Sequence, residues 1–244
     1  MGMRKAYIVF AALCIIAVLG QVKTSVPLPT DAQVQLPAEP KYIALTFDDG
    51  PKRGTTDVLL DGLRERGVSA TFFLVGSQIG GNEDLVLRMQ AEGHQVGNHT
   101  WSHVTLENAA EETILREIGQ TETKLAELLD GDSYWVRPPY GLILPKDRPL
   151  VPVPMIKWSL DTRDWEKRNT EHVLQAILDG AESNAIVLLH DIYPTSVEAA
   201  LKAVDALQKE GYQFVTVEEL MALNGVKPLP GVMYRNGRGD LAWG

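Results

Sequence analysis

Short apolar runs alternate along this chain with longer segments in which apolar residues recur every three or four positions. The apolar runs predict strands and the periodic segments predict helices. The predicted strands are 42–47, 70–74, 95–97, 134–136, 155–158, 185–189 and 214–216. The predicted helices are 55–66, 82–92, 110–129, 170–179 and 196–210, followed by a short one after Thr216. Thr216 and Glu219 have the spacing of a capping box, which supports that last helix.

Strands that alternate with helices predict a parallel sheet covered by helices, in either a barrel or a doubly wound sheet. The placement of the polar residues favours a barrel, since barrel enzymes build their sites at the carboxyl ends of several strands. Five predicted strands are followed by acidic or basic side chains, namely Asp48 and Asp49, His99 and His103, Arg137, Asp161 and Asp164, and His190. We therefore expect an α/β, TIM-barrel-like fold of about seven parallel strands.

The two ends of the chain differ from the body. Arg4 and Lys5 precede an apolar run over 7–20, so residues 1–20 are predicted to be a signal peptide or an N-terminal membrane anchor, with a tether through residues 6–20. Both alternatives place the body outside the cytoplasmic membrane, secreted or anchored to its outer face. Residues 21–40 contain four prolines and are expected to be a linker. The folded domain is expected over 41–225, with a loose C-terminal tail over 226–244.

Composition excludes some classes of function. The formal net charge is −9, and the body has no basic run, so a phosphate-binding surface for nucleic acid is not expected. Cys14 is the only cysteine and lies in the N-terminal apolar run, so the body is expected to contain no disulfide. We expect a monomer.

His99 and His103 are the first candidates for chemistry. Their spacing of four can bring two imidazoles to one metal ion. The alternative is a pair of polar surface histidines, but the chain has only five histidines in all. The pair therefore favours a metal site.

Asp48 and Asp49 directly follow an apolar run. Adjacent carboxylates repel unless a cation or an arginine is near. In an extended backbone they would point to opposite sides, so that one could bind a metal while the other meets a water molecule. The alternative is an ordinary Asp-Asp-Gly turn, which the neighbouring histidine pair makes less attractive.

Five motifs occur in a fixed order: T-F-D-D-G at 46–50, H-T-W-S-H at 99–103, R-P-P-Y at 137–140, D-T-R-D-W at 161–165 and L-L-H at 188–190. In this the chain resembles the polysaccharide deacetylases of carbohydrate esterase family 4, over roughly residues 41–223. The resemblance implies a distorted (β/α) barrel with fewer strands than the usual eight. The Pro-rich segment 142–154 looks irregular, so the groove rim there is not predicted.

The resemblance also implies roles for individual residues. Asp49, His99 and His103 would hold one divalent metal ion. Asp48 would be the general base and His190 the general acid.

The remaining roles concern the surroundings of these groups. Arg137 would pair with Asp48, and the backbone N–H of Tyr140 would help bind the oxyanion. Asp164 would be the partner of His190, with Asp161 as the alternative. Trp165 and Leu188 would line the pocket for the acetyl methyl group.

The expected activity is metal-dependent hydrolysis of the N-acetyl group of N-acetylglucosamine in a cell-wall polysaccharide, releasing acetate. Peptidoglycan is preferred because the chain is expected to be exported. The alternatives are chitin or chitooligosaccharides, O-acetyl xylan, or a carbohydrate-binding relative without turnover. Two nitrogens and one oxygen suit Zn²⁺, although Co²⁺, Ni²⁺ or Mn²⁺ also fit such ligands.

Overall fold

The computed structural model describes residues 40–131 and 133–242. The predictions for 1–20, for 21–39 and for Cys14 lie outside the described residues. Within the described ranges, no helix has the length and the apolar character needed to cross a membrane.

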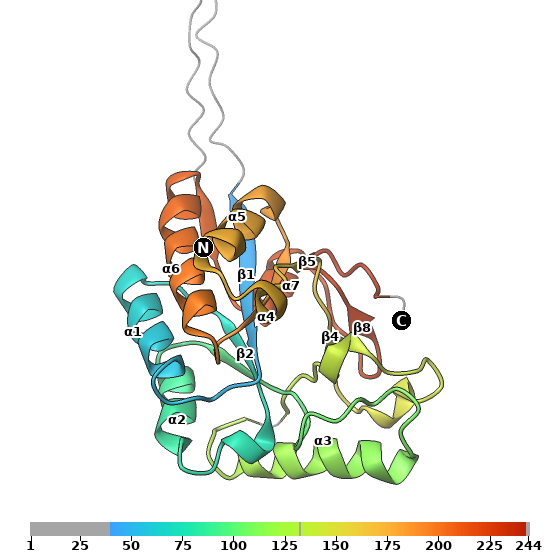
Figure 1. The fold of residues 1–244 in the computed structure, drawn as a ribbon. Coiled ribbons are helices and arrows are strands. Elements are labelled where there is room, and N and C mark those ends of the chain that lie inside the picture. Colours follow the sequence, from blue (N-terminus) through green and yellow to red (C-terminus); the bar gives the residue numbers. More distant parts are fainter. Residues whose placement is uncertain (1–39, 132, 243–244) are drawn as a thin grey trace, which may run out of the picture. The chain divides into compact units, whose positions relative to one another are not determined.

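A six-stranded parallel sheet forms the centre of the fold, with the strand order β3-β2-β1-β6-β5 and with β7 paired to β1. The strands are β1 (Lys41–Asp48), β2 (Thr71–Leu74), β3 (Gln95–Asn98), β5 (Leu160–Asp161), β6 (Ile186–His190) and β7 (Tyr212–Phe214). The long β1 lies in the middle (Figure 1), and Asp48 at its end is level with His190 at the end of β6. The α/β class and the parallel sheet are confirmed.

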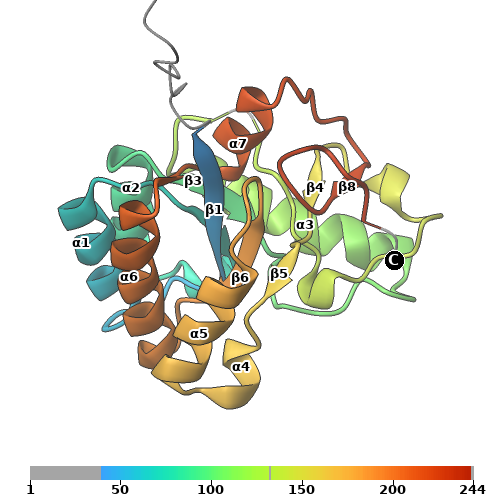
Figure 2. The same cartoon turned by 90° about the horizontal axis from the view of Figure 1, so that it is seen from above.

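A second, two-stranded parallel sheet joins β4 (Met155–Ile156) to β8 (Met233–Tyr234). Val136 links the two sheets, because it bridges to Asn98 on one side and to Met155 on the other. Figure 2 shows β4 and β8 beside α3, apart from β1 and β6. Within the described part the strands do not close into a ring, which differs from the predicted barrel. Prolines at 138, 139, 152 and 154 flank these short pairings, and a proline has no N–H to donate to a ladder.

Helices cover the sheet, and most begin and end near the predicted positions. They are α1 (Thr56–Arg66), α2 (Glu83–Ala91), α3 (Glu111–Ala126), α4 (Asp164–Lys167), α5 (Thr170–Gly180), α6 (Pro194–Lys209) and α7 (Val217–Leu223). The capping box of α7 is confirmed, with Thr216 Oγ1 accepting from the Glu219 N–H and the Glu219 carboxylate accepting from the Thr216 N–H. Among the α-helices and strands of the described residues, α4, β5 and β8 were not predicted.

The two faces of β1 have different environments, and this alternation positions the site. Ile43, Leu45 and Phe47 are fully buried in the main core beneath the outer helices. Burying each such side chain contributes about 1.5–3 kcal/mol. The alternate residues Thr46 and Asp48 project to the other face, where both contact a buried arginine.

The C-terminal segment differs from the predicted loose tail. Met233, Tyr234 and Ala242 are buried, and β8 pairs with β4. These few apolar residues cover the edge that β4 would otherwise expose, which explains why a segment rich in Gly and Pro packs onto the domain.

Candidate functional site

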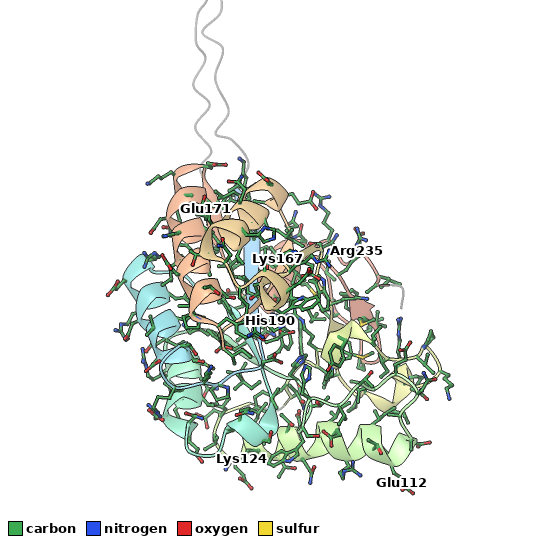
Figure 3. All side chains as sticks on the ribbon, viewed as in Figure 1. Glu112, Lys124, Lys167, Glu171, His190 and Arg235 are labelled. Carbon is green, nitrogen blue, oxygen red and sulfur yellow. The ribbon has the colours of Figure 1, made fainter. Side chains whose placement is uncertain are left out.

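The polar residues predicted at strand ends do meet at the carboxyl edge of the sheet. Asp48 and His190 end the neighbouring strands β1 and β6, and His99 directly follows β3. Figure 3 labels His190 near the middle of the face in view. One hollow of about 460 Å³ is lined by 11 residues, namely Asp48, Asp49, His99, His103, Tyr140, Trp158, Asp161, Trp165, Leu188, His190 and Tyr193.

Asp49, His99 and His103 form a group that could hold a metal ion, since one ligand atom from each lies within 4.8 Å of the others. The Nε2 atom of His103 is 3.3 Å from Asp49 Oδ1, and that of His99 is 3.7 Å from it. Asp49 Oδ1 is buried and has no hydrogen-bond partner among the described residues. An orphaned carboxylate oxygen beside two imidazoles fits a divalent cation.

The orientation of His99 is fixed by its other ring nitrogen. Its Nδ1 is 2.6 Å from the carbonyl oxygen of Arg137, so Nδ1 carries the hydrogen and Nε2 keeps its lone pair. Burial lowers the pKa of His99, which also favours the neutral ring that can bind a metal. A backbone carbonyl behind a ligand histidine is a common second contact in metal sites.

Asp48 and Asp49 do not point to opposite sides, which corrects the expectation from an extended backbone. The Asp48 and Asp49 carboxylates lie 3.6 and 3.7 Å from the same atom, His99 Nε2. The reason is the backbone at Asp49, whose φ of 74° ends the strand geometry and turns this side chain back toward the histidines.

Arg137 is fully buried and binds Asp48. Its Nη1 donates to Asp48 Oδ1 and to Thr46 Oγ1, both at 2.7 Å. Nε also donates to the Ile156 carbonyl and Nη2 to the Lys157 carbonyl. Burial lowers the pKa of Arg137 and the charge of Asp48 opposes this effect. A buried guanidinium and a buried carboxylate thus compensate each other's charge.

His190 contacts Asp164 rather than Asp161. The Asp164 carboxylate is fully buried; it accepts from His190 Nδ1 at 2.8 Å and from the His190 backbone N–H at 2.7 Å. Asp161 is exposed and accepts instead from the Arg163 N–H. Burial alone would lower the pKa of His190, but the hydrogen bond to Asp164 and the charges of Asp164, Asp48 and Asp49 raise it to about 9.

The walls of the hollow are aromatic and apolar. Leu188 is buried, whereas Trp165 and Tyr140 are exposed at the rim. The Tyr140 ring packs edge-on against the His103 ring, with centroids 5.0 Å apart. Trp158 and Tyr193 also line the hollow and were not predicted to do so. Tyr193 follows the L-L-H motif by three residues, which is the one sequence signal that could have suggested it.

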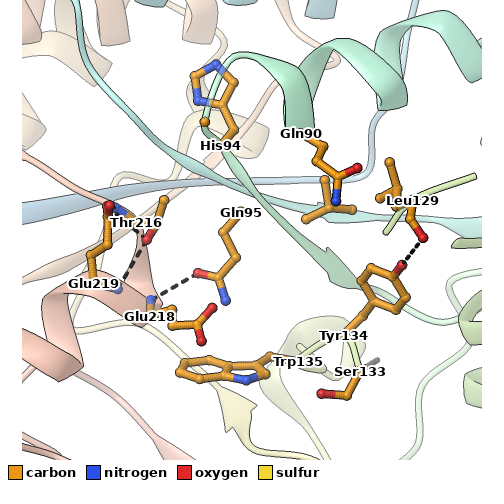
Figure 4. A pocket seen from close by; sticks show the side chains of 12 residues that line it. Gln90, His94, Gln95, Leu129, Ser133, Tyr134, Trp135, Thr216, Glu218 and Glu219 are labelled. Carbon is orange, nitrogen blue, oxygen red and sulfur yellow. Dashed lines mark hydrogen bonds between the residues drawn. The ribbon is translucent and has the colours of Figure 1, made fainter. Parts of the chain in front are cut away.

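A different hollow lies at the amino end of β3, beside the start of α7, and contains none of the predicted site residues (Figure 4). Gln95 accepts there from the Glu218 N–H at 3.0 Å, which ties α7 to β3. His94 accepts through Nδ1 from the Ala70 N–H, and burial lowers its pKa to about 4. Neutral His94 therefore belongs to the framework.

Comparison with known proteins gives consistent results. A family model described as polysaccharide deacetylase matches residues 35–149. A peptidoglycan-N-acetylglucosamine deacetylase from Bacillus cereus is 36% identical over 205 residues, covering 77% of this chain and 91% of that protein. The peptidoglycan-N-acetylglucosamine deacetylase PgdA of Listeria monocytogenes is 39% identical over 194 residues, covering 78% of this chain. This chain spans only 42% of the length of that relative.

A solved structure shares the fold. It is a family 4 acetyl xylan esterase from Clostridium thermocellum in complex with a cobalt ion. It matches with a TM-score of 0.76 and 32% identity, covering 80% of this chain and 98% of that one.

Proposed function

This chain belongs to the polysaccharide deacetylase family, and we propose that it removes the N-acetyl group from N-acetylglucosamine units of a cell-wall polysaccharide, releasing acetate. One observation carries the proposal: a metal-ligand group, an arginine-paired carboxylate and an aspartate-paired histidine line the same hollow.

Asp49, His99 and His103 would hold one divalent ion, for which zinc is our first choice and Co²⁺, Ni²⁺ or Mn²⁺ the alternatives. Such an ion, when bound, polarises the acetyl carbonyl and makes a water molecule more acidic. The protein residues then do the rest of the chemistry.

Asp48 acts as the general base in this proposal. It is paired with Arg137 and lies against the ligand group, so it can take the proton of a water molecule that attacks the acetyl carbon. Arg137 is fully buried and does not touch the substrate; it holds Asp48 in place.

His190 acts as the general acid and protonates the departing nitrogen. Its raised pKa keeps it cationic at neutral pH, and Asp164 fixes its ring through Nδ1, which leaves Nε2 to face the hollow. The Tyr140 N–H would stabilise the oxyanion, and Trp165 and Leu188 would enclose the methyl group. Asp161 is exposed at the rim, where we expect it to contact the substrate rather than to pair with His190.

Peptidoglycan is the proposed substrate, supported by the names of the relatives and by the expected export of the body through residues 1–20. Chitin, chitooligosaccharides and O-acetyl xylan are the alternatives, and the esterase of similar fold keeps the last of these open. A binding protein without turnover is disfavoured, because a pure binder needs neither Asp48 nor His190 in these paired arrangements.

The test is acetate release. The purified protein with Zn²⁺ is incubated with peptidoglycan, chitooligosaccharides and acetylated xylan, and each glycan is examined by mass spectrometry. A loss of one acetyl mass per N-acetylglucosamine in peptidoglycan is expected. Acetate released from xylan alone would indicate an acetyl xylan esterase instead of an N-deacetylase. Acetate from none of the three glycans would overturn the proposal.

A further inference from the structure

A second hollow, of about 480 Å³, adjoins the catalytic hollow and shares Asp49 and His103 with it. The second hollow therefore lies within reach of a sugar unit next to one bound over the metal ligands. The other lining residues are Pro51, Lys52, Val75, Ser77, Gln78, Ser102 and Ile192.

The second hollow differs from the first in its chemistry. The catalytic hollow has four Trp or Tyr side chains, whereas the second has none and presents hydroxyl, amide and ammonium groups instead. Lys52 is the one Lys or Arg among its lining residues, and Asp49, one of the ligand group, is the one carboxylate. A metal bound to Asp49 would offset that negative charge, so the hollow would be positive overall.

Lys52 is held in place but keeps donors to spare. Its Nζ donates to the Ile192 carbonyl at 3.0 Å, which leaves the ammonium with further N–H groups for a ligand. Its backbone N–H donates to Thr56 Oγ1 at 2.8 Å, and Thr56 in turn binds the buried Asp191. The neighbouring Arg53, by contrast, is paired with Asp84.

The turn that carries Lys52, between β1 and α1 (Figure 1), is also fixed from the inside. A Cβ at Gly50 would lie within 2.8 Å of the carboxyl carbon of Asp191, so only glycine allows this close approach. The backbone that carries Lys52 is thus fixed beside the metal ligands.

We propose that Lys52 binds a carboxylate carried by the sugar next to the one being deacetylated, and so selects an anionic wall glycan over neutral chitin or xylan. This inference rests on the proposed function. Peptidoglycan offers the carboxylate either on the lactyl ether of its muramic acid or on the peptide attached there. A local cation matters more here because the chain carries a net charge of −9, which by itself repels an anionic polymer.

The experiment measures dissociation constants by calorimetry in an Asp48→Asn background, so that the ligand is not consumed. The ligands are an alternating N-acetylglucosamine–muramic acid tetrasaccharide with free lactyl carboxylates, the same glycan with those carboxylates amidated, the glycan bearing its peptides, and chitotetraose. At low salt we expect the free carboxylate form to bind about fivefold more tightly than the amidated form, the size of a charge-assisted contact at a partly exposed site.

The Lys52 variants decide the outcome. Lys52→Gln should bring this affinity ratio to about one, Lys52→Glu should reverse it, and Lys52→Arg should largely keep it. The matched control is Lys209→Gln, an exposed lysine at the far end of α6, which should leave the ratio unchanged. The proposal would be overturned if no carboxylated glycan bound the parent more tightly than the amidated glycan does. It would also be overturned if Lys52→Gln left such a preference unchanged.

The remaining arms separate the sources. A preference present in the peptide-free glycan assigns the lactyl carboxylate, and one that needs the peptide assigns a peptide carboxylate. Failure of the proposed function is a different result, namely no acetate from any glycan, and the binding ratio can still be read in that case.

Discussion

Replacing Asp164 with Asn should make the stability of this protein depend differently on pH. In the folded protein the pKa of His190 is about 9, against an ordinary value of 6.5. Since one pKa unit corresponds to about 1.4 kcal/mol, this difference stabilises the fold by about 3 kcal/mol. Because the folded pKa is the higher one, the contribution is fully present below pH 6.5 and is lost as the pH rises through about 9.

Asparagine removes the charge but keeps the shape. Burial, which lowers the pKa of His190, would then be opposed only by the more distant Asp48 and Asp49. Asn also has one acceptor oxygen in place of two, so one of the bonds from the His190 or Trp165 N–H groups is lost at every pH. The free energy of unfolding of the variant should therefore be lower than that of the parent by two amounts. One is the same at every pH, and the other is largest near pH 6 and small above pH 9.

The assay is thermal unfolding from pH 5 to pH 10 with a chelator present, so that metal binding does not vary with pH. A 3 kcal/mol loss in a domain of this size lowers the Tm by roughly 6–12 °C, and we expect this near pH 6. In a His190→Ala background the pH-dependent part should vanish, as a double-mutant cycle requires. An equal loss of Tm at pH 6 and pH 10 would refute the coupling between Asp164 and His190.

Other predictions follow from the same geometry. His103→Ala should lower the amount of bound zinc measured by mass spectrometry, and full zinc occupancy in this variant would show that His103 is not a ligand. A chelator should abolish acetate release by the parent. Asp48→Asn should keep its zinc but lose turnover by about 10²–10⁴-fold, whereas Asp49→Asn should weaken zinc binding, and the reverse pattern would swap the two roles. Arg137→Met leaves Asp48 buried without its partner and should lower the free energy of unfolding, measured in urea, by about 3–5 kcal/mol. An unchanged urea midpoint would show that the Arg137–Asp48 pair does not stabilise the fold.

The sequence predicts those parts of the fold whose stability is local. α1 ends where Gly67 adopts a left-handed φ of 62°, and α7 begins at its capping box, and both features can be read from a few neighbouring residues. β5 and β8 could not be predicted in this way. Each has two residues, too few for a periodic pattern, and β8 exists because Met233 pairs with Met155 across the fold.

The candidate site was likewise predictable from the sequence only in part. The motifs identify which residues meet, because the carboxyl ends of parallel strands share one edge of the sheet. They do not give the direction of Asp49, which depends on a single left-handed φ, or the choice between Asp161 and Asp164, which depends on the turn into α4. Trp158 and Tyr193 were missed because a wall residue needs only the right position and carries no chemical pattern of its own.

The adjacent carboxylates of Asp48 and Asp49 illustrate how surroundings separate two identical groups. Both lie close to His99 Nε2, so proximity to the ligand group does not distinguish them. Their other contacts do, because Asp48 Oδ1 accepts from a buried guanidinium and Asp49 Oδ1 accepts from nothing among the described residues. A carboxylate already neutralised by Arg137 gains less from a metal cation than an unpaired one does. These contacts support the proposed division of roles, with the cation beside Asp49 and with Asp48 as the base.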